Sequence, residues 1–151
     1  MENYINNLDL VLGDVDITLD ENAIEPERQY AFDGGADLFS PIDCTIEPMS
    51  DIVIDTGVHV CIPKSFCGIV MNRSGMNMKY KVETALGLID SGYTGSVRVR
   101  LVNESNEEYN IKRGDRISQI IIIPCNVSGF HLVDNLDKTE RGKDGFGSTG
   151  K

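Results

Sequence analysis

The chain has 151 residues, which fits a single domain spanning residues 1–151 with enough length to bury a hydrophobic core. Its 24 acidic and 14 basic residues give a formal net charge of −10 at pH 7. Such an acidic protein lacks the broad basic face that binds a phosphate backbone, so we expect no nucleic-acid partner.

Targeting signals and cysteine spacing point to one compartment. The N-terminus has no basic region and no long apolar core, so we expect no signal peptide. No apolar run approaches the length of a membrane span, so we expect no membrane partner. The cysteines have no zinc or redox spacing, and we expect all four to be reduced and in or near the core: Cys44, Cys61, Cys67 and Cys125. The expected location is the cytoplasm, which is the host cytoplasm if the gene is viral.

Short apolar segments bounded by turn residues fill the first half of the chain, and this pattern predicts an all-β fold. We expect strands over residues 15–19, 36–41, 44–46 and 66–71. Residues 51–63 contain two apolar runs around Thr56-Gly57, which predicts two strands separated by a turn. Residues 76–80 are the best helix candidate, with one or two turns.

Asp37 stands among apolar neighbours, where a carboxylate is expected to have a specific polar or charged partner. It either caps a turn or contacts a metal ion or a metal-bound water. Arg73, Ser74 and Gly75 follow the strand expected at 66–71, and together they can present a guanidinium, a hydroxyl and a backbone N–H to one anion. Ser74 has no plausible base near it in the sequence, so we do not expect it to be a nucleophile.

The stretch from 87 to 103 has the clearest pattern in the chain. Its apolar side chains alternate with Arg98 and Arg100, which predicts a strand with one buried face. Residues 91–95 contain two glycines and predict a turn. We therefore expect a β-hairpin with Asp90 and Tyr93 at its mouth. The alternative is an ordinary hairpin with a solvated aspartate and a packed tyrosine.

The second half ends in a glycine-rich tail. Residues 103–110 are polar and acidic, and we expect a solvated loop there, followed by a turn and a strand within 111–124. His59 and His131 are too few for a histidine-based metal site, so we expect both to be structural or surface residues. The tail from 140 to 151 should be mobile when free. Residues 145–151 resemble a phosphate-binding loop but lack its following hydroxyl residue and helix.

Five stretches of the chain now fall in one order: 36–41, 73–75, 87–103, 113–121 and 141–150. With the sequences GLIDSGYTG, GDRISQI and RGKDGFGSTG, this order resembles the homotrimeric deoxyuridine triphosphatase (dUTPase) family over residues 30–151. The resemblance implies a distorted jelly-roll-like β-barrel with at most one short helix and a mobile C-terminal arm at 137–151. It also implies a homotrimer whose three active sites are shared between subunits.

The activity implied by the resemblance is Mg²⁺-dependent hydrolysis of dUTP to dUMP and pyrophosphate, by in-line water attack on the α-phosphorus. This reaction limits uracil in DNA and supplies dUMP for thymidylate synthesis. Asp90 would activate the water, and Tyr93 would pack on the deoxyribose. Asp37 would reach Mg²⁺ through water, with the substrate phosphates as direct ligands. The implied substrate-binding residues are Arg73, Ser74, Gly75, Thr84, Leu86, Gly87, Ile89, Tyr93, Gln119, Arg141, Phe146, Gly147, Ser148 and Thr149.

Three positions depart from the family pattern. Asn72 stands where many members have proline, Thr84 where bacterial members often have a uracil-reading asparagine, and Gly92 where an acidic residue is common. Two other functions remain open. One is a dCTP deaminase of the same fold, for which Glu83 is the only acidic candidate near the base. The other is a regulatory protein gated by dUTP, with a protein partner that the sequence does not identify. A jelly-roll without a ligand is least consistent with the separated Arg, Ser and Gly turns.

Overall fold

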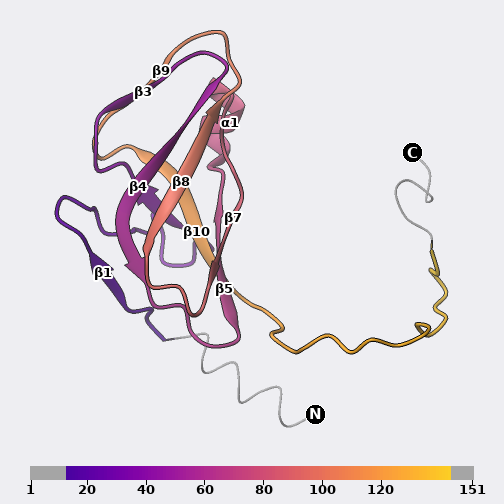
Figure 1. Cartoon of the computed structure of the whole chain (residues 1–151). Helices are drawn as coiled ribbons and strands as arrows, with labels where there is room; N and C mark the ends of the chain where they lie inside the picture. The colour runs from indigo at the N-terminus through magenta and orange to yellow at the C-terminus, as the bar shows by residue number, and fades with distance from the viewer. Residues whose placement is uncertain (1–12, 144–151) are drawn as a thin grey trace.

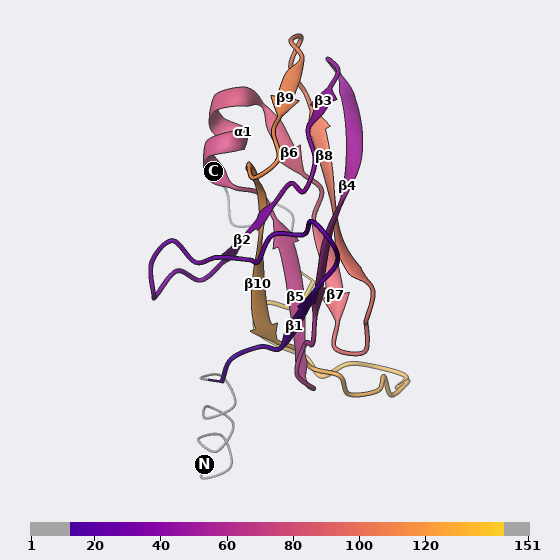
Figure 2. The same cartoon turned by 90° about the vertical axis from the view of Figure 1, so that its left-hand side faces the viewer.

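The protein is described from a computed structural model that places residues 13–143. Two four-stranded antiparallel sheets face each other and enclose the core (Figures 1 and 2). The first sheet has the order β1 (Ile17–Leu19), β4 (Ser50–Val60), β8 (Ser96–Asn103), β6 (Val82–Thr84). The second has the order β2 (Ala36–Phe39), β10 (Arg116–Pro124), β5 (Phe66–Met71), β7 (Gly87–Asp90). A small third sheet pairs β3 (Cys44–Ile46) with β9 (Tyr109–Ile111), and the helix α1 covers Ser74–Tyr80.

The all-β, jelly-roll-like prediction with one short helix is therefore confirmed. The core is built by apolar side chains that alternate along strands from both sheets. In β8, Val97, Val99 and Leu101 are completely buried while the intervening arginines are exposed, as the period of two predicts. Leu38 of β2 and Ile120 of β10 meet them from the opposite sheet.

The turn predicted at Thr56-Gly57 is wrong, because β4 continues through it as one strand of 11 residues. Asp55 pairs with Arg98 and His59 with Ser96, so three residues of β4 pass opposite a single residue of β8 and the strand carries a bulge there. Gly57 takes a φ of 67°, which a glycine adopts without strain. The buried Thr56 hydroxyl donates to the Val97 carbonyl at 2.7 Å and keeps β4 attached to β8 across the bulge.

The β-hairpin predicted for 87–103 is also wrong in its pairing. Strand β7 pairs with β5, whereas β8 pairs with β4 and β6, and no ladder within residues 13–143 joins β7 to β8. Residues 91–95 form a loop that carries the chain from one sheet to the other. Alternation along a strand reports which face is buried but not which strand lies beside it, so the pattern predicted the strands correctly and their partner incorrectly.

Two smaller expectations also fail. Cys61 is exposed rather than near the core, although all four cysteines are free thiols. Asn103 is fully buried instead of solvated, and its side-chain amide donates to the carbonyls of Ile46, Glu47 and Glu107. This amide fastens the 104–108 loop to β3, a long-range role that local polarity does not reveal.

After β10 the chain leaves the body of the molecule. Figure 1 shows this segment running away from both sheets, and every residue from 126 to 143 is exposed. It carries large apolar side chains without cover, including Phe130, Leu132 and Leu136. Within residues 13–143 there is no helix long and apolar enough to cross a membrane.

Candidate active site

A polar cavity of about 310 Å³ lies where β2, the end of β5 and β10 meet. Sequence reasoning placed Asp37, Arg73, Ser74, Gly75 and Gln119 at one site, and all five line this cavity. Residues 72–73 are extended after β5, and Ser74 and Gly75 open α1. Residues from three separate stretches of sequence therefore converge, and the cavity also gains Gln29, Asp33, Gly34 and Gly35 from the loop before β2.

The half-buried Asp37 carboxylate lies between two arginines. The Arg73 Nε–H donates to Asp37 Oδ1 at 2.8 Å, and Arg116 Nε lies 2.9 Å from Oδ2. The second contact is an ion pair without hydrogen-bond alignment. The Arg73 Nη1 also donates to the Arg116 carbonyl at 3.2 Å. Asp37 thus fixes the plane of the Arg73 guanidinium at the cavity wall, which is the orientation that anion recognition requires.

The contacts of Asn72 explain why asparagine can stand where many family members have proline. Its side-chain oxygen accepts a hydrogen bond from the Thr84 backbone N–H, and its own carbonyl accepts one from Gln119 Nε2 at 2.7 Å. A proline could not make the side-chain contact. Asn72 therefore connects the segment after β5 to β6 and to β10, and it holds Gln119 at the cavity.

Thr84 lies in β6 with its side chain turned inward. The residue is buried, and its hydroxyl lies 3.3 Å from the Ile117 carbonyl, to which it donates. The side chain therefore stabilises the contact between β6 and β10.

Strand β7 lies at the edge of its sheet. Among residues 13–143 it pairs only with β5, so alternate backbone N–H and C=O groups along its outer side are available to a ligand. Leu86 and Leu88 are exposed beside this edge, while Gly87 and Ile89 are half-buried. Of the expected substrate-binding residues, Gly87 and Ile89 thus lie in this edge strand, and Leu86 immediately precedes it.

Asp90 ends β7, and its side chain is exposed. The 91–95 loop that follows is closed by a hydrogen bond from the Tyr93 N–H to the Asp90 carbonyl at 3.0 Å. The Tyr93 hydroxyl donates to the Ser96 carbonyl at 2.9 Å, which holds the ring across Gly95 with 42% of the residue exposed. Asp90 and Tyr93 therefore flank one hydrogen-bonded turn, with the Tyr93 ring partly open to solvent.

These two groups of residues do not meet within one chain. Asp90 pairs with Cys67 on β5, whereas Gly87 pairs with Val70, so β7 runs away from Arg73. Arg73 lies six residues beyond Cys67, and at about 3.3 Å per residue this separates Asp90 from Arg73 by roughly 20 Å. Groups that act on the same water molecule must both lie within hydrogen-bond reach of it, and within residues 13–143 of one chain Asp90 and Arg73 are too far apart for that.

The donor set also limits how a metal ion can bind. Residues 13–143 contain no cluster of three or more His, Cys, Asp or Glu side chains suited to a metal ion. The cavity offers Asp33 and Asp37, and Asp37 already faces two arginines. This set fits Mg²⁺ that takes its direct ligands from substrate phosphates and water, as Mg²⁺ commonly does.

The structure describes only part of the C-terminal stretch that the resemblance assigns to the substrate. Arg141 is described and exposed. Phe146, Gly147, Ser148 and Thr149, which the resemblance places at the substrate, lie outside the described residues. Sequence reasoning did not predict the roles of Asn72 and Arg116. The one signal for Asn72 was its departure from proline, and no local pattern marked Arg116 as a partner of Asp37.

Comparison with known proteins agrees with this geometry. Residues 21–150 match the family model of dUTPase. The chain is 41% identical over 135 residues to the mouse deoxyuridine 5'-triphosphate nucleotidohydrolase, covering 89% of this chain and 83% of that protein. The mitochondrial human enzyme of the same name is 41% identical over 133 residues, covering 88% of this chain and 53% of that protein. The dUTPase of Staphylococcus bacteriophage 80alpha with dUpNHpp superposes with a TM-score of 0.87 at 30% identity, covering 92% of this chain and 99% of that chain.

Proposed function

The chain belongs to the dUTPase family, and we propose that it hydrolyses dUTP at active sites completed by neighbouring copies of the chain. Conversion of dUTP to dUMP is the activity for which its relatives are named, and it is the activity of this protein. Removal of dUTP limits uracil in DNA, and dUMP is the precursor for thymidylate synthesis. The separation of Asp90 from Arg73 supports the sharing of sites.

Asp90 is the proposed catalytic base. Its exposed carboxylate can accept a proton from a water molecule and aim that water at the α-phosphorus, in line with the departing pyrophosphate. A carboxylate at the end of an otherwise apolar strand is suited to this role, and the hydrogen bond from the Tyr93 N–H holds the Asp90 backbone carbonyl in the turn.

The cavity around Arg73 is the proposed phosphate site. Arg73 presents a guanidinium oriented by Asp37, Ser74 adds a hydroxyl, and Gln119 is held by Asn72. Mg²⁺ bound to the phosphates would neutralise charge on the departing pyrophosphate. Asp37 and Asp33 would face its water shell rather than bind it directly.

Substrate selection is assigned to β7 and the 91–95 loop. The free edge of β7 around Gly87 and Ile89 would pair with the polar edge of uracil through backbone groups. The exposed Tyr93 ring would pack against the deoxyribose and leave no space for a 2′-hydroxyl. The buried Thr84 side chain would contribute only indirectly, by holding β6 against β10.

A homotrimer is the proposed assembly. The base of one subunit then reaches the phosphates held by the next, which removes the separation found within one chain. Residues 126–143 extend from the body with exposed apolar side chains, as expected of a segment that packs on another copy. This segment would deliver Arg141, Phe146, Ser148 and Thr149 to a neighbouring site, where Phe146 would stack on uracil. Closure would exclude water and hold the triphosphate.

Asp90→Asn tests the base. Loss of a general base lowers kcat by about 100-fold or more, while the dissociation constant for dUpNHpp should change little because the side-chain shape is kept. Asp14→Asn removes a different exposed carboxylate and serves as the control. Full turnover in Asp90→Asn would remove Asp90 from catalysis.

Subunit mixing tests the shared site. Asp90→Asn and Arg73→Lys should each be nearly inactive, the latter because lysine keeps the charge beside Asp37 but not the planar guanidinium. When the two are unfolded and refolded together in equal amounts, about one quarter of the sites in random trimers combine an intact Asp90 with an intact Arg73. Recovery of activity near this fraction supports sharing, and no recovery means that each chain builds its own site.

Two alternatives from the sequence remain to be weighed. The comparisons favour the dUTPase over the dCTP deaminase, and parallel assays for pyrophosphate from dUTP and ammonia from dCTP test this directly. The phage 80alpha dUTPase is described as controlling transfer of virulence genes by a G protein-like mechanism. A similar dUTP-gated role here would require nucleotide to protect residues 137–151 from protease, and equal cleavage with and without dUpNHpp would exclude it.

The cytoplasm is the proposed location.

A further inference from the structure

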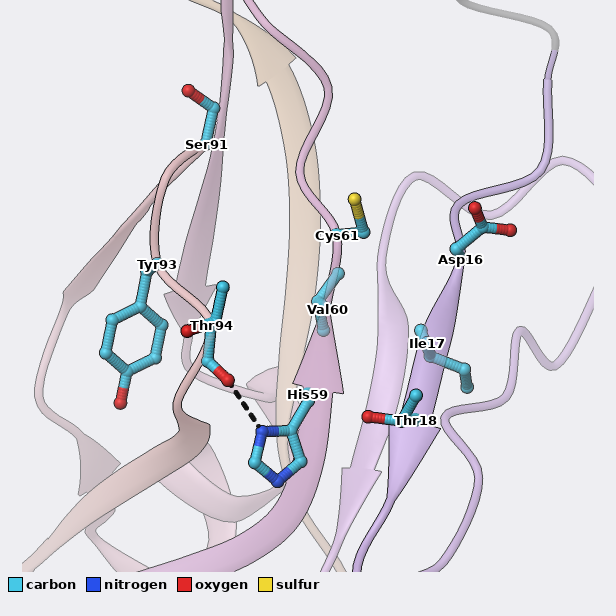
Figure 3. A pocket seen from close by; sticks show the side chains of 9 residues that line it. All are labelled: Asp16, Ile17, Thr18, His59, Val60, Cys61, Ser91, Tyr93 and Thr94. Carbon is cyan, nitrogen blue, oxygen red and sulfur yellow. Dashed lines mark hydrogen bonds between the residues drawn. The ribbon is translucent and has the colours of Figure 1, made fainter.

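His59 connects two loops that are far apart in the sequence. It lies at the end of the β4 bulge and borders a cavity of about 200 Å³ between β1 and the 91–95 loop (Figure 3). Its Nδ1 is 2.8 Å from the Thr94 carbonyl oxygen, and its Nε2 is 3.2 Å from Asp20 Oδ1. The ring thus bridges the turn after β1 and the loop that carries Tyr93.

The hydrogen-bonding partners of His59 determine which protonation state of its ring can make both bonds. A carbonyl and a carboxylate are both acceptors, so each ring nitrogen needs a hydrogen to make its bond. The imidazolium form can donate from both nitrogens at once. A neutral ring donates from only one and turns a lone pair toward the other acceptor.

The 91–95 loop has few other anchors. Its remaining hydrogen bonds, from the Tyr93 N–H to Asp90 and from the Tyr93 hydroxyl to Ser96, are internal to the turn. Among the hydrogen bonds of residues 13–143, the one from His59 is what ties this loop to another part of the chain. Asp20, the other partner of His59, is itself held in place, since its backbone N–H donates to the Gly57 carbonyl at 2.8 Å.

We propose that His59 is a positioning residue for substrate binding, which holds the 91–95 loop so that Tyr93 presents its ring to the sugar of dUTP. This inference rests on the proposed role of Tyr93. Because the bond is made to the carbonyl of the next residue, Thr94, its loss lets the turn move without unfolding the strands on either side. His59 does not touch the reacting atoms, so substrate affinity and sugar discrimination depend on it more than the chemical step does.

The charges around the ring add a pH dependence. The pKa of His59 is raised mainly by its hydrogen bond to the Thr94 carbonyl, and further by Asp20 and Asp55, against a partial opposing effect of burial. The ring therefore makes both hydrogen bonds below this raised pKa, and the pair of bonds is lost as the pH rises through it. The titratable groups facing the ring from neighbouring segments are Asp16, Asp20, Asp55, Cys61 and Tyr93.

Two substitutions separate the bonds. His59→Ala removes both. We expect the KM for dUTP to rise about fivefold with little change in kcat, because only the bond to the Thr94 carbonyl holds the loop and it is partly exposed. His59→Asn places an amide donor near the Nδ1 position and should recover most of the affinity. The pH dependence of KM between pH 6 and 9 should flatten in both variants. Thr45→Val, which removes a similarly exposed side-chain hydrogen bond between β3 and β9, is the control.

Backbone hydrogen exchange at residues 91–96 provides a readout independent of activity. His59→Ala should speed exchange there, and His59→Asn should restore it. Unchanged exchange and unchanged KM in His59→Ala would overturn the inference. Faster exchange with an unchanged KM and an unchanged preference for dUTP over UTP would instead show that the loop takes no part in sugar recognition. That outcome would contradict the proposed role of Tyr93, on which this inference rests.

Discussion

Asp37→Asn separates a structural role of this carboxylate from a metal role. The Asp37 side chain is only 14% exposed, and its oxygens lie 2.8 and 2.9 Å from Arg73 Nε and Arg116 Nε. Asparagine keeps the shape and can still accept the hydrogen bond from Arg73, but it removes the negative charge that both arginines face. The two guanidiniums would then be held close together without compensation.

The size of the effect follows from burial. Breaking a fully buried ion pair by removing one partner costs about 3–5 kcal/mol. The Arg73 and Arg116 side chains are 33% and 37% exposed, so solvent screens part of this cost. We expect the free energy of unfolding to fall by about 1–2 kcal/mol. In urea this corresponds to a midpoint lower by roughly 0.5–1 M, given typical slopes for small domains.

The assay is equilibrium urea unfolding with EDTA and without nucleotide, at one protein concentration because assembly contributes to stability. Asp134→Asn changes an exposed carboxylate in the extended segment and is the control. If the midpoint of Asp37→Asn equals that of the wild type in EDTA while activity with Mg²⁺ is lost, Asp37 acts only on the metal, and the argument from the arginine contacts is refuted.

Three further predictions test other parts of the site. Tyr93→Ala should allow UTP to be hydrolysed, because the exposed ring that would exclude a 2′-hydroxyl is gone; continued rejection of UTP would place sugar discrimination elsewhere. Deletion of residues 141–151 should remove most turnover but keep the urea midpoint of the core, whose buried residues lie between Leu38 and Ile120; loss of folding would make the arm structural. Iodoacetamide at pH 8 should modify the exposed Cys61 well before Cys67, because burial and the hydrogen bond with Cys125 raise the pKa of the Cys67 thiol and keep it protonated; equal rates by mass spectrometry would contradict this.

Local patterns were sufficient for much of the fold. Alternation in residues 96–103 predicted the buried face of β8, and short apolar runs bounded by turn residues predicted most strands and the all-β class. The spacing of the five motifs identified the family. These features are set by neighbouring residues, since burial alternates with a period of two and turns depend on a few consecutive residues.

Pairing between distant segments was decided only by the tertiary structure. It placed β7 beside β5 rather than β8, kept β4 continuous through a bulge, and enclosed Asp37 between two arginines. It also separated Asp90 from Arg73 along β5 and brought His59 to the Thr94 carbonyl. Each outcome depends on which strands share a sheet and in what register, and a single sequence carries no local signal for that choice because many partners bury the same face equally well.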